Sequence, residues 1–303
     1  MSKFGVVHGL IYKSKSIINL QYLLPYVNKN INHSCVIIDT GIYPHVDFCL
    51  GKNRIIEFVD LINQNIIPYD DNGHGTFTAG VFCGNSIIDK YSGIDNNANI
   101  IVIKALNDVG ETTTVKILQA VKWIIENKSK FNIKVVCMSF GSELDKIKDP
   151  LIYGADALWD NGIVVVCAGG NSGPAGNTIM SPGASQKIIT VGAMDVVGDH
   201  YDVADFSSRG PAFDNYKPDL IVPGVDIIST NIFDKNKKFY TKMTGTSVST
   251  PIVAGVVSLM LKVNPNYTPN QIKYMLINSC VSINGDRNAE GFGRLDLSKL
   301  KLI

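Results

Sequence analysis

The sequence lacks a charge excess of either sign and lacks clustered metal-binding cysteines. Lys and Arg total 28 against 27 Asp and Glu, so the formal charge is +1 and no basic field is available for a nucleic-acid backbone. None of the six cysteines forms a C-x-x-C pair or lies near a histidine at zinc-ligand spacing. These absences argue against a nucleic-acid partner and against a cysteine-bound metal.

Long apolar runs are absent as well. No stretch of 18 consecutive apolar residues occurs, so we expect no membrane span. The first 20 residues carry lysines and lack the uninterrupted apolar core of a signal peptide. We therefore expect a cytoplasmic protein with reduced thiols. Its cysteines are Cys35, Cys49, Cys83, Cys137, Cys167 and Cys280.

The 303 residues contain a regular alternation of short apolar runs and helical patterns. Hydrophobic residues make up 45% and charged residues 18%, which is ordinary for a globular enzyme with a sizeable core. Continuous β-branched runs predict buried strands of a parallel sheet. These runs lie at residues 35–38, 100–103, 133–138, 163–167 and 188–191.

The segments between these runs have helical spacing. Residues 113–127 and 151–159 are amphipathic, whereas residues 249–263 are apolar nearly all round and predict a core helix. A last helix is expected to begin after Thr268, with that threonine as N-cap and Pro269 in the first helical position.

This alternation predicts an α/β fold: three layers, with a doubly wound, mostly parallel sheet and helices on both faces. Residues 31–303 are expected to form one domain, and residues 1–30 an N-terminal extension. In open sheets of this kind, chemistry is found at the carboxyl ends of the strands. Asp39 and the segment after Cys167 are both predicted to lie there.

Three local motifs carry the side chains of nucleophilic catalysis. Each alone is also typical of ordinary turns and helix caps. Together, they supply an acid at the end of a strand, a glycine-flanked histidine and a serine at the start of the core helix. The motifs are Ile37-Ile38-Asp39-Thr40-Gly41, Asp71-Asn72-Gly73-His74-Gly75-Thr76 and Gly245-Thr246-Ser247-Val248-Ser249-Thr250-Pro251.

The order Asp39, His74, Ser247 is the order of the subtilisin triad, and differs from that of chymotrypsin or the α/β-hydrolases. Over residues 31–297 the chain resembles the subtilisin-like serine proteases, with the intracellular bacterial members closest in appearance. Further segments share the family's pattern: Ser139-Phe140-Gly141, Ala168-Gly169-Gly170-Asn171-Ser172-Gly173, Phe206-Ser207-Ser208-Arg209-Gly210-Pro211 and Lys217-Pro218-Asp219-Leu220.

The resemblance implies an endopeptidase that acts on proteins or peptides through an acyl-enzyme and needs no cofactor for the chemistry. Ser247 would be the nucleophile, His74 the general base and then acid, and Asp39 the group that fixes the imidazole. The helix N-terminus at Ser247 favours developing negative charge. Asn171 matches the family's side-chain donor to the oxyanion and is otherwise a turn asparagine.

The resemblance also implies a groove that binds an extended peptide by strand addition. One edge corresponds to Gly110 and Glu111, and the other to Ser139, Phe140 and Gly141. The pocket for the residue before the cut would be walled by these segments and by Ala168, Gly169 and Gly170.

Two residues near this groove have alternative interpretations. Met180 either shortens the pocket or fills the core. Glu111 either draws basic substrates or is an exposed turn carboxylate. Asp47 matches a family calcium ligand, but the loop at residues 85–89 departs from the usual ligand pattern, so structural calcium is possible and no metal site is assigned.

Three other functions compete with an active protease. A silent relative that only binds peptides or regulates a partner would be expected to lack a triad residue, and none is missing. A serine esterase needs a Gly-x-Ser-x-Gly elbow, which is absent around Ser247. A structural protein would leave the glycine-rich loops unexplained. The oligomeric state stays open.

The extension offers a further hypothesis. Its apolar segment 21–26 resembles the inhibitory N-terminal motif of intracellular subtilisins and would then lie in the groove as an extended strand. The alternative is an extension that packs on the body and covers apolar surface.

Overall fold

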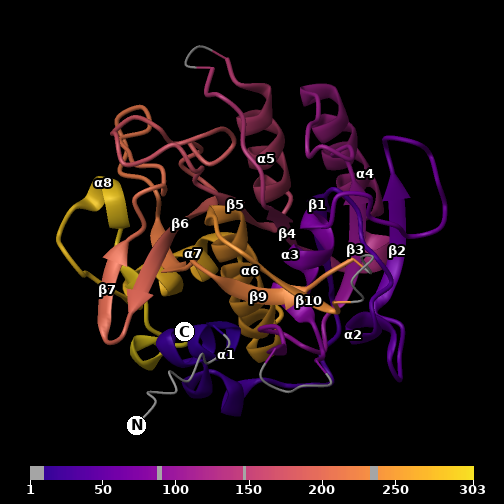
Figure 1. The fold of residues 1–303 in the computed structure, drawn as a ribbon, viewed down its shortest axis with the longest axis horizontal. Coiled ribbons are helices and arrows are strands. Elements are labelled where there is room, and N and C mark those ends of the chain that lie inside the picture. Colours follow the sequence, from indigo (N-terminus) through magenta and orange to yellow (C-terminus); the bar gives the residue numbers. More distant parts are fainter. Residues whose placement is uncertain (1–9, 87–90, 146–147, 233–237) are drawn as a thin grey trace, which may run out of the picture.

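The computed structural model describes residues 10–86, 91–145, 148–232 and 238–303. Its centre is a 10-stranded, mostly parallel sheet in the order β11-β12-β8-β6-β5-β4-β1-β3-β2, with β7 antiparallel to β6 (Figure 1). The strands are β1 (Ser34–Asp39), β2 (Ile55–Asp60), β3 (Asn99–Lys104), β4 (Ile133–Met138), β5 (Val164–Ala168), β6 (Ile189–Val197), β7 (His200–Val203), β8 (Leu220–Pro223), β11 (Cys280–Val281) and β12 (Arg294–Leu295).

All five strands predicted from the apolar runs are present. β1, β3 and β5 are buried along their whole length, as expected for a parallel sheet that is covered on both faces. The pattern did not predict β2, in which buried residues are interspersed with exposed and half-buried ones. A separate antiparallel pair is formed by β9 (Ile227–Thr230) and β10 (Tyr240–Met243).

Helices cover both faces of the sheet, so the predicted α/β three-layer fold is confirmed. α4 and α5 pack together on one side, and α3 packs against α6 on the other (Figure 1). The helices are α1 (Leu10–Ile17), α2 (Val46–Cys49), α3 (His74–Cys83), α4 (Thr114–Phe131), α5 (Pro150–Asp160), α6 (Thr246–Val263), α7 (Pro269–Asn278) and α8 (Arg287–Glu290), with short 3-10 helices η1 (Leu20–Tyr22), η2 (Leu24–Tyr26) and η4 (Leu297–Lys299).

α6 is the core helix that the sequence predicts, although it begins three residues earlier, at Thr246. Within the described residues it is the one helix that is long and apolar enough to cross a membrane, but 89% of these 18 residues are buried inside the fold. It is therefore the central helix of a folded domain. α7 begins as predicted, with a capping box between Thr268 and Gln271.

The described part of the N-terminal extension packs at the far end of α6. Leu23 is buried in the main core, Asn28 N–H donates to Lys262 O at 3.0 Å, and Leu297 N–H donates to Ile18 O at 2.9 Å. Lys262 lies about 22 Å along the helix from Ser247. The expectation that residues 21–26 lie extended in the groove is therefore wrong for this structure. They form η1 and η2, because Leu20 and Leu23 turn into the core.

Candidate active site

The predicted acid and base are in direct contact. Asp39 is the last residue of β1, and His74 is the first residue of α3. His74 Nδ1 lies 2.7 Å from Asp39 Oδ1, which also accepts the Thr40 N–H at 2.8 Å. The Asp39 side chain is fully buried and that of His74 is 26% exposed. A buried carboxylate thus orients an imidazole that solvent and substrate can still reach.

A second carboxylate holds the start of α3. Asp70 accepts hydrogen bonds from Gly73 N–H at 2.8 Å, from Thr76 N–H at 2.9 Å and from the Thr40 hydroxyl at 3.0 Å. These bonds satisfy free amides at the helix N-terminus and tie it to the end of β1. The sequence motifs did not single out Asp70, because its partners come together only in the folded chain.

Packing against the end of β1 requires a glycine at position 75, directly after His74. A Cβ at Gly75 would lie 2.2 Å from Gly41 O and 3.2 Å from the Asp39 Cβ. Only glycine lets the first turn of α3 approach the end of β1 this closely. That approach is what brings the imidazole to the carboxylate.

The electrostatics favour a charged imidazole next to Asp39. Burial lowers the pKa of His74, but the charge of Asp39 and its hydrogen bond, together with the charge of Asp70, outweigh burial. The pKa of His74 is therefore raised above its ordinary value of 6.5. A raised pKa strengthens the imidazole as a base once it is neutral.

Asn171 and Ser247 meet around Gly245. The Oδ1 atom of Asn171 accepts from Thr246 N–H and from the Thr246 hydroxyl, both at 2.9 Å. Its Nδ2 atom is consequently turned the other way: a Cβ at Gly245 would lie 3.4 Å from Asn171 Nδ2, 3.1 Å from Ser247 Oγ and 3.7 Å from Ser247 N. A side-chain N–H and a main-chain N–H thus lie around the serine hydroxyl.

Four of the predicted groove residues line one cavity. Gly110 and Glu111 on one edge face Phe140 and Gly141 on the other, across a cavity of about 330 Å³. Glu111 is exposed, and its main-chain N–H is held by the Asn107 side chain at 2.8 Å. The two predicted edges of the groove therefore face each other across this cavity.

Met180 lies between the two predicted walls of the pocket. A Cβ at Gly141 would be 2.8 Å from Met180 Cβ, and one at Gly170 would be 2.6 Å from Met180 Cγ. The Met180 N–H donates to Gly169 O at 2.9 Å. Ala168 ends β5, while Ser139 is buried just after β4. Met180 therefore occupies space that glycines 141 and 170 leave open, a position that fits both a shortened pocket and core packing.

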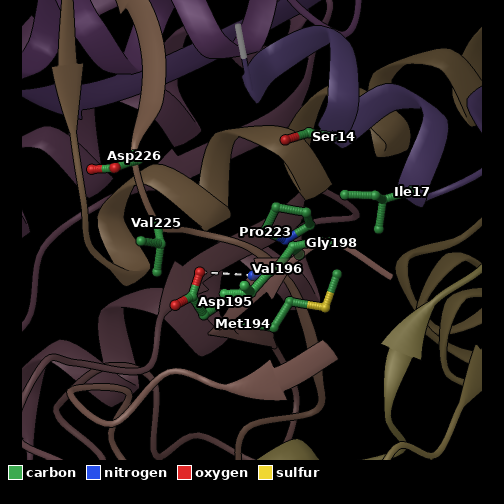
Figure 2. Close-up of a pocket in the computed structure, with 10 residues that line it drawn as sticks. Ser14, Ile17, Met194, Asp195, Val196, Gly198, Pro223, Val225 and Asp226 are labelled. Carbon is green, nitrogen blue, oxygen red and sulfur yellow. Dashed lines mark hydrogen bonds between the residues drawn. The ribbon is translucent and has the colours of Figure 1, made fainter. Parts of the chain in front are cut away.

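Among the cavities outside the predicted residues, two share Asp195 and Val225 in their linings. One, of about 390 Å³, separates α1, through Ser14 and Ile17, from Met194 and Pro223 (Figure 2). The other, of about 680 Å³, is lined by Thr244, Phe206 and Arg209 among others. The loop that contributes Phe206 and Arg209 to this cavity is joined to the Asn171 turn, because Gly173 N–H donates to Phe206 O at 2.9 Å. This second cavity therefore adjoins the serine side of the site.

Asp47, the predicted match to a calcium ligand, already has protein partners. Its carboxylate accepts from the Tyr240 hydroxyl at 2.9 Å, and its main-chain oxygen accepts from the Arg54 guanidinium. A guanidinium beside the carbonyl opposes a second cation there. Among the described residues no cluster of three or more His, Cys, Asp or Glu is placed to hold a metal. Part of the neighbouring loop, residues 87–89, lies outside the described residues.

A solved structure has the same architecture. The chain matches the crystal structure of a cold adapted subtilisin-like serine proteinase with a TM-score of 0.74 and 26% sequence identity, over 91% of each chain. The fold and the Asp39–His74 contact thus define a protein of the subtilisin-like class.

The sequence comparison gives the family. Residues 32–293 match the model of the Subtilase family, and the chain belongs to that family. It is 43% identical to serine protease AprX of Bacillus subtilis (strain 168) in an alignment 266 residues long that covers 80% of this chain and 60% of AprX. It is 31% identical to subtilisin DY of Bacillus licheniformis over 272 residues, which are 89% of this chain and 90% of that protein. The family inferred from the motifs is therefore confirmed, and it is a family of serine proteases.

Proposed function

We propose that this chain is a serine endopeptidase that hydrolyses peptide bonds through an acyl-enzyme, with Asp39, His74 and Ser247 as its triad. The observation that carries the proposal is the 2.7 Å contact between His74 Nδ1 and the buried Asp39 carboxylate. With Nδ1–H donated to the acid, Nε2 of the neutral imidazole is left without a proton and can act as a base. The family's order of acid, base and serine supports the same assignment.

The reaction would run in two steps. Ser247 Oγ attacks the carbonyl carbon while His74 takes its proton, and His74 then gives that proton to the leaving amine. In the second step, water attacks the acyl-enzyme while His74 takes its proton, and His74 then gives that proton to Ser247 Oγ as the acid product leaves. Asp39 stabilises the imidazolium in both steps without taking the proton. The Asn171 amide and the Ser247 N–H would hold the oxyanion, because both lie around the serine hydroxyl. No cofactor takes part in these steps.

The substrate would be an unfolded segment of a protein or a peptide. Main-chain hydrogen bonds to the two edges at Gly110 and Gly141 would give affinity, and the pocket beside Met180 would set the side-chain preference. Because Met180 occupies part of the space between the pocket walls, we propose small or medium residues before the cut. The cavity beside Thr244 and Phe206 would receive the residues after it.

The silent-relative alternative has less support. The acid–base pair is intact and the imidazole is partly exposed, whereas a binding protein has no need of either feature. We also propose a cytoplasmic location, which the six free cysteines support. Burial raises the pKa of one of them, Cys83, to about 11, so its thiol is mostly protonated and unreactive at neutral pH.

The test is mass-spectrometric mapping of cuts in a denatured protein library, with Ser247→Ala as the control. An active protease gives new termini that share a small or medium residue before the cut, and these termini disappear with the variant. Cuts that persist in Ser247→Ala would come from another protease, and an absence of cuts by the wild-type chain would favour the silent relative.

A further inference from the structure

One fully buried lysine links three segments that carry the proposed site. Lys104 ends β3 and is the register partner of Asp39 in the neighbouring strand β1. Its side chain is 0% exposed, so its ammonium group is removed from water. A buried charge is costly unless every donor is satisfied.

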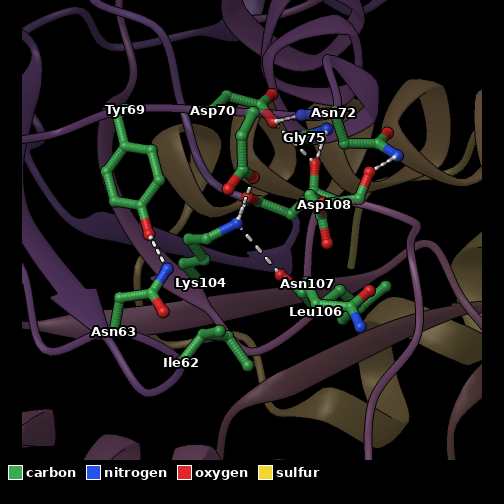
Figure 3. A network of polar contacts seen from close by, with 12 residues as sticks. Ile62, Asn63, Tyr69, Asp70, Asn72, Gly75, Lys104, Leu106, Asn107 and Asp108 are labelled. Atoms are coloured by element: carbon green, nitrogen blue, oxygen red, sulfur yellow. Dashed lines mark hydrogen bonds and ion pairs between the residues drawn. The ribbon is translucent and has the colours of Figure 1, made fainter.

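All three ammonium protons have acceptors, and each acceptor belongs to a different segment. Lys104 Nζ lies 2.6 Å from Thr40 O, 2.6 Å from Asp71 Oδ1 and 3.2 Å from Leu106 O. Figure 3 shows the Lys104 side chain directed toward the Asp70 and Leu106 segments. The Tyr69 ring lies 5.0 Å from Nζ and covers the group.

The first two acceptors lie next to the acid and the base. Thr40 directly follows Asp39, and its N–H donates to the Asp39 carboxylate. Asp71 precedes Asn72, whose Oδ1 accepts the His74 N–H at 3.1 Å. Moving either segment would therefore move a member of the acid–base pair.

The third acceptor begins one edge of the groove. Leu106 lines the cavity that also contacts Gly110 and Glu111. The Asn72 side chain bonds this loop independently, to Asp108 O at 2.9 Å. The groove edge and the histidine loop are thus connected at two points, one of which is the Lys104 ammonium group.

We propose that Lys104 is a positioning residue that holds the Asp39–His74 pair in register with the substrate groove. The proposal rests on the proposed protease function and adds a residue that touches neither substrate nor the reacting atoms. Displacing a catalytic group by about 1 Å can lower a rate a hundredfold. Loss of the ammonium group releases Thr40, Asp71 and Leu106 together.

The test compares Lys104→Met with Lys262→Met in the full-length chain. Lys262 is the matched control, because it is also buried and ion-paired, to Asp95 at 2.7 Å, but lies at the far end of α6. Active centres are counted by titration with an acylating reagent, and kcat and KM are measured per active centre. One substrate is a tetrapeptide amide that reaches the groove edge, and the other is a single-residue ester that does not.

For Lys104→Met we expect kcat per active centre to fall about ten- to a hundredfold on both substrates, with KM raised only for the tetrapeptide. Lys262→Met should lower the melting temperature and leave both constants within about twofold of wild type. Equal kcat losses in the two variants, or wild-type constants in Lys104→Met, would overturn the inference.

Asp71→Asn provides the second variant if Lys104→Met does not fold, because the Asp71 side chain is 36% exposed and the change replaces the ion pair to Lys104 with a weaker neutral hydrogen bond at nearly the same volume. Here we expect kcat to fall roughly fivefold with KM unchanged, since the Leu106 contact remains. An unchanged kcat would overturn the inference. A wild-type chain without Ser247-dependent hydrolysis would overturn the proposed function as well, so the two failures are distinguishable.

Discussion

The two ends of α6 carry the same kinds of side chain in different arrangements. At the far end, His33 Nε2 lies 3.0 Å from Ser258 Oγ, which donates to Asp95 Oδ2 at 2.6 Å. There the serine lies between histidine and acid, and Lys262 neutralises the acid at 2.7 Å. At the near end, the histidine bonds the acid directly.

The surroundings also set the two histidines apart. His33 is only 4% exposed, and burial together with the charge of Lys262 lowers its pKa to about 4. His74 is more accessible, and Asp39 raises its pKa against the effect of burial. An imidazole with a low pKa and no access to substrate is a poor general base. The order of contacts and the exposure of the imidazole, more than the residue types, distinguish the near end as the proposed active site.

The largest expected effect is the contrast between the two serines. Ser247→Ala should lower kcat for peptide hydrolysis about a millionfold, the loss recorded for subtilisin, because no nucleophile remains. Ser258→Ala removes a buried hydroxyl shared by His33 and Asp95, so it should lower the melting temperature and leave kcat per active centre unchanged. Steady-state kinetics with thermal denaturation checks both variants, and substantial hydrolysis by folded Ser247→Ala would break the comparison.

The proposed oxyanion donor is next in size. Asn171→Ala should lower kcat about a hundredfold to a thousandfold with KM nearly unchanged, because the amide acts on charge that develops in the transition state. Measurement of kcat and KM on one peptide separates the roles. A change confined to KM would show that Asn171 binds substrate in its ground state.

Much of the site was predictable because its signals are local. The continuous β-branched runs located β1, β3 and β5, and glycine-flanked His74 marked the start of α3. The Lys104 contacts were not predictable, since they join residues 64 and 33 positions apart. A lysine directly after the apolar run 100–103 was the available signal.

The contacts among His33, Ser258 and Asp95 and the packing of the N-terminal extension were not predictable for the same reason. His33 and Ser258 are 225 positions apart, and only the folded α6 brings them together. The apolar residues of segment 21–26 indicate burial but do not specify which surface covers them. Burial of Leu23 in the main core decided between packing on the body and lying in the groove.

The two histidines should give opposite dependences on pH. The folded state favours neutral His33, so its contribution to stability is complete above the unfolded pKa of about 6.5 and is lost as the pH falls toward 4. The loss is about 3 kcal/mol. Unfolding free energies of wild type and His33→Gln between pH 4 and 8 measure it. An equal loss in the variant would contradict the assignment to His33.

The raised pKa of His74 gives the opposite dependence of folding stability on pH. Charged His74 stabilises the folded state below pH 6.5, and this contribution is lost as the pH rises through the higher folded pKa. Over the same range activity should rise, because the base must be neutral, and the midpoint of kcat/KM should lie above 6.5. A profile flat from pH 5 to 9 would argue against His74 as the base.

The smallest expected effect concerns the pocket beside Met180 at the near end of α6. Met180→Gly should extend cleavage toward large aromatic residues before the cut, by about 1–3 kcal/mol in transition-state binding, because it vacates the space between Gly141 and Gly170. Cleavage profiles on a peptide library compare the variant with wild type. An unchanged profile would assign Met180 to core packing.

The most direct test of the central claim is covalent labelling of the native protein with a fluorophosphonate, followed by peptide mapping in a mass spectrometer. Only an activated serine beside a base attacks this reagent at neutral pH. The proposed triad predicts one adduct, on Ser247, that is lost in His74→Ala, while Ser258 stays unlabelled. Labelling that survives in folded His74→Ala, or a native protein without an adduct on Ser247, would contradict the account.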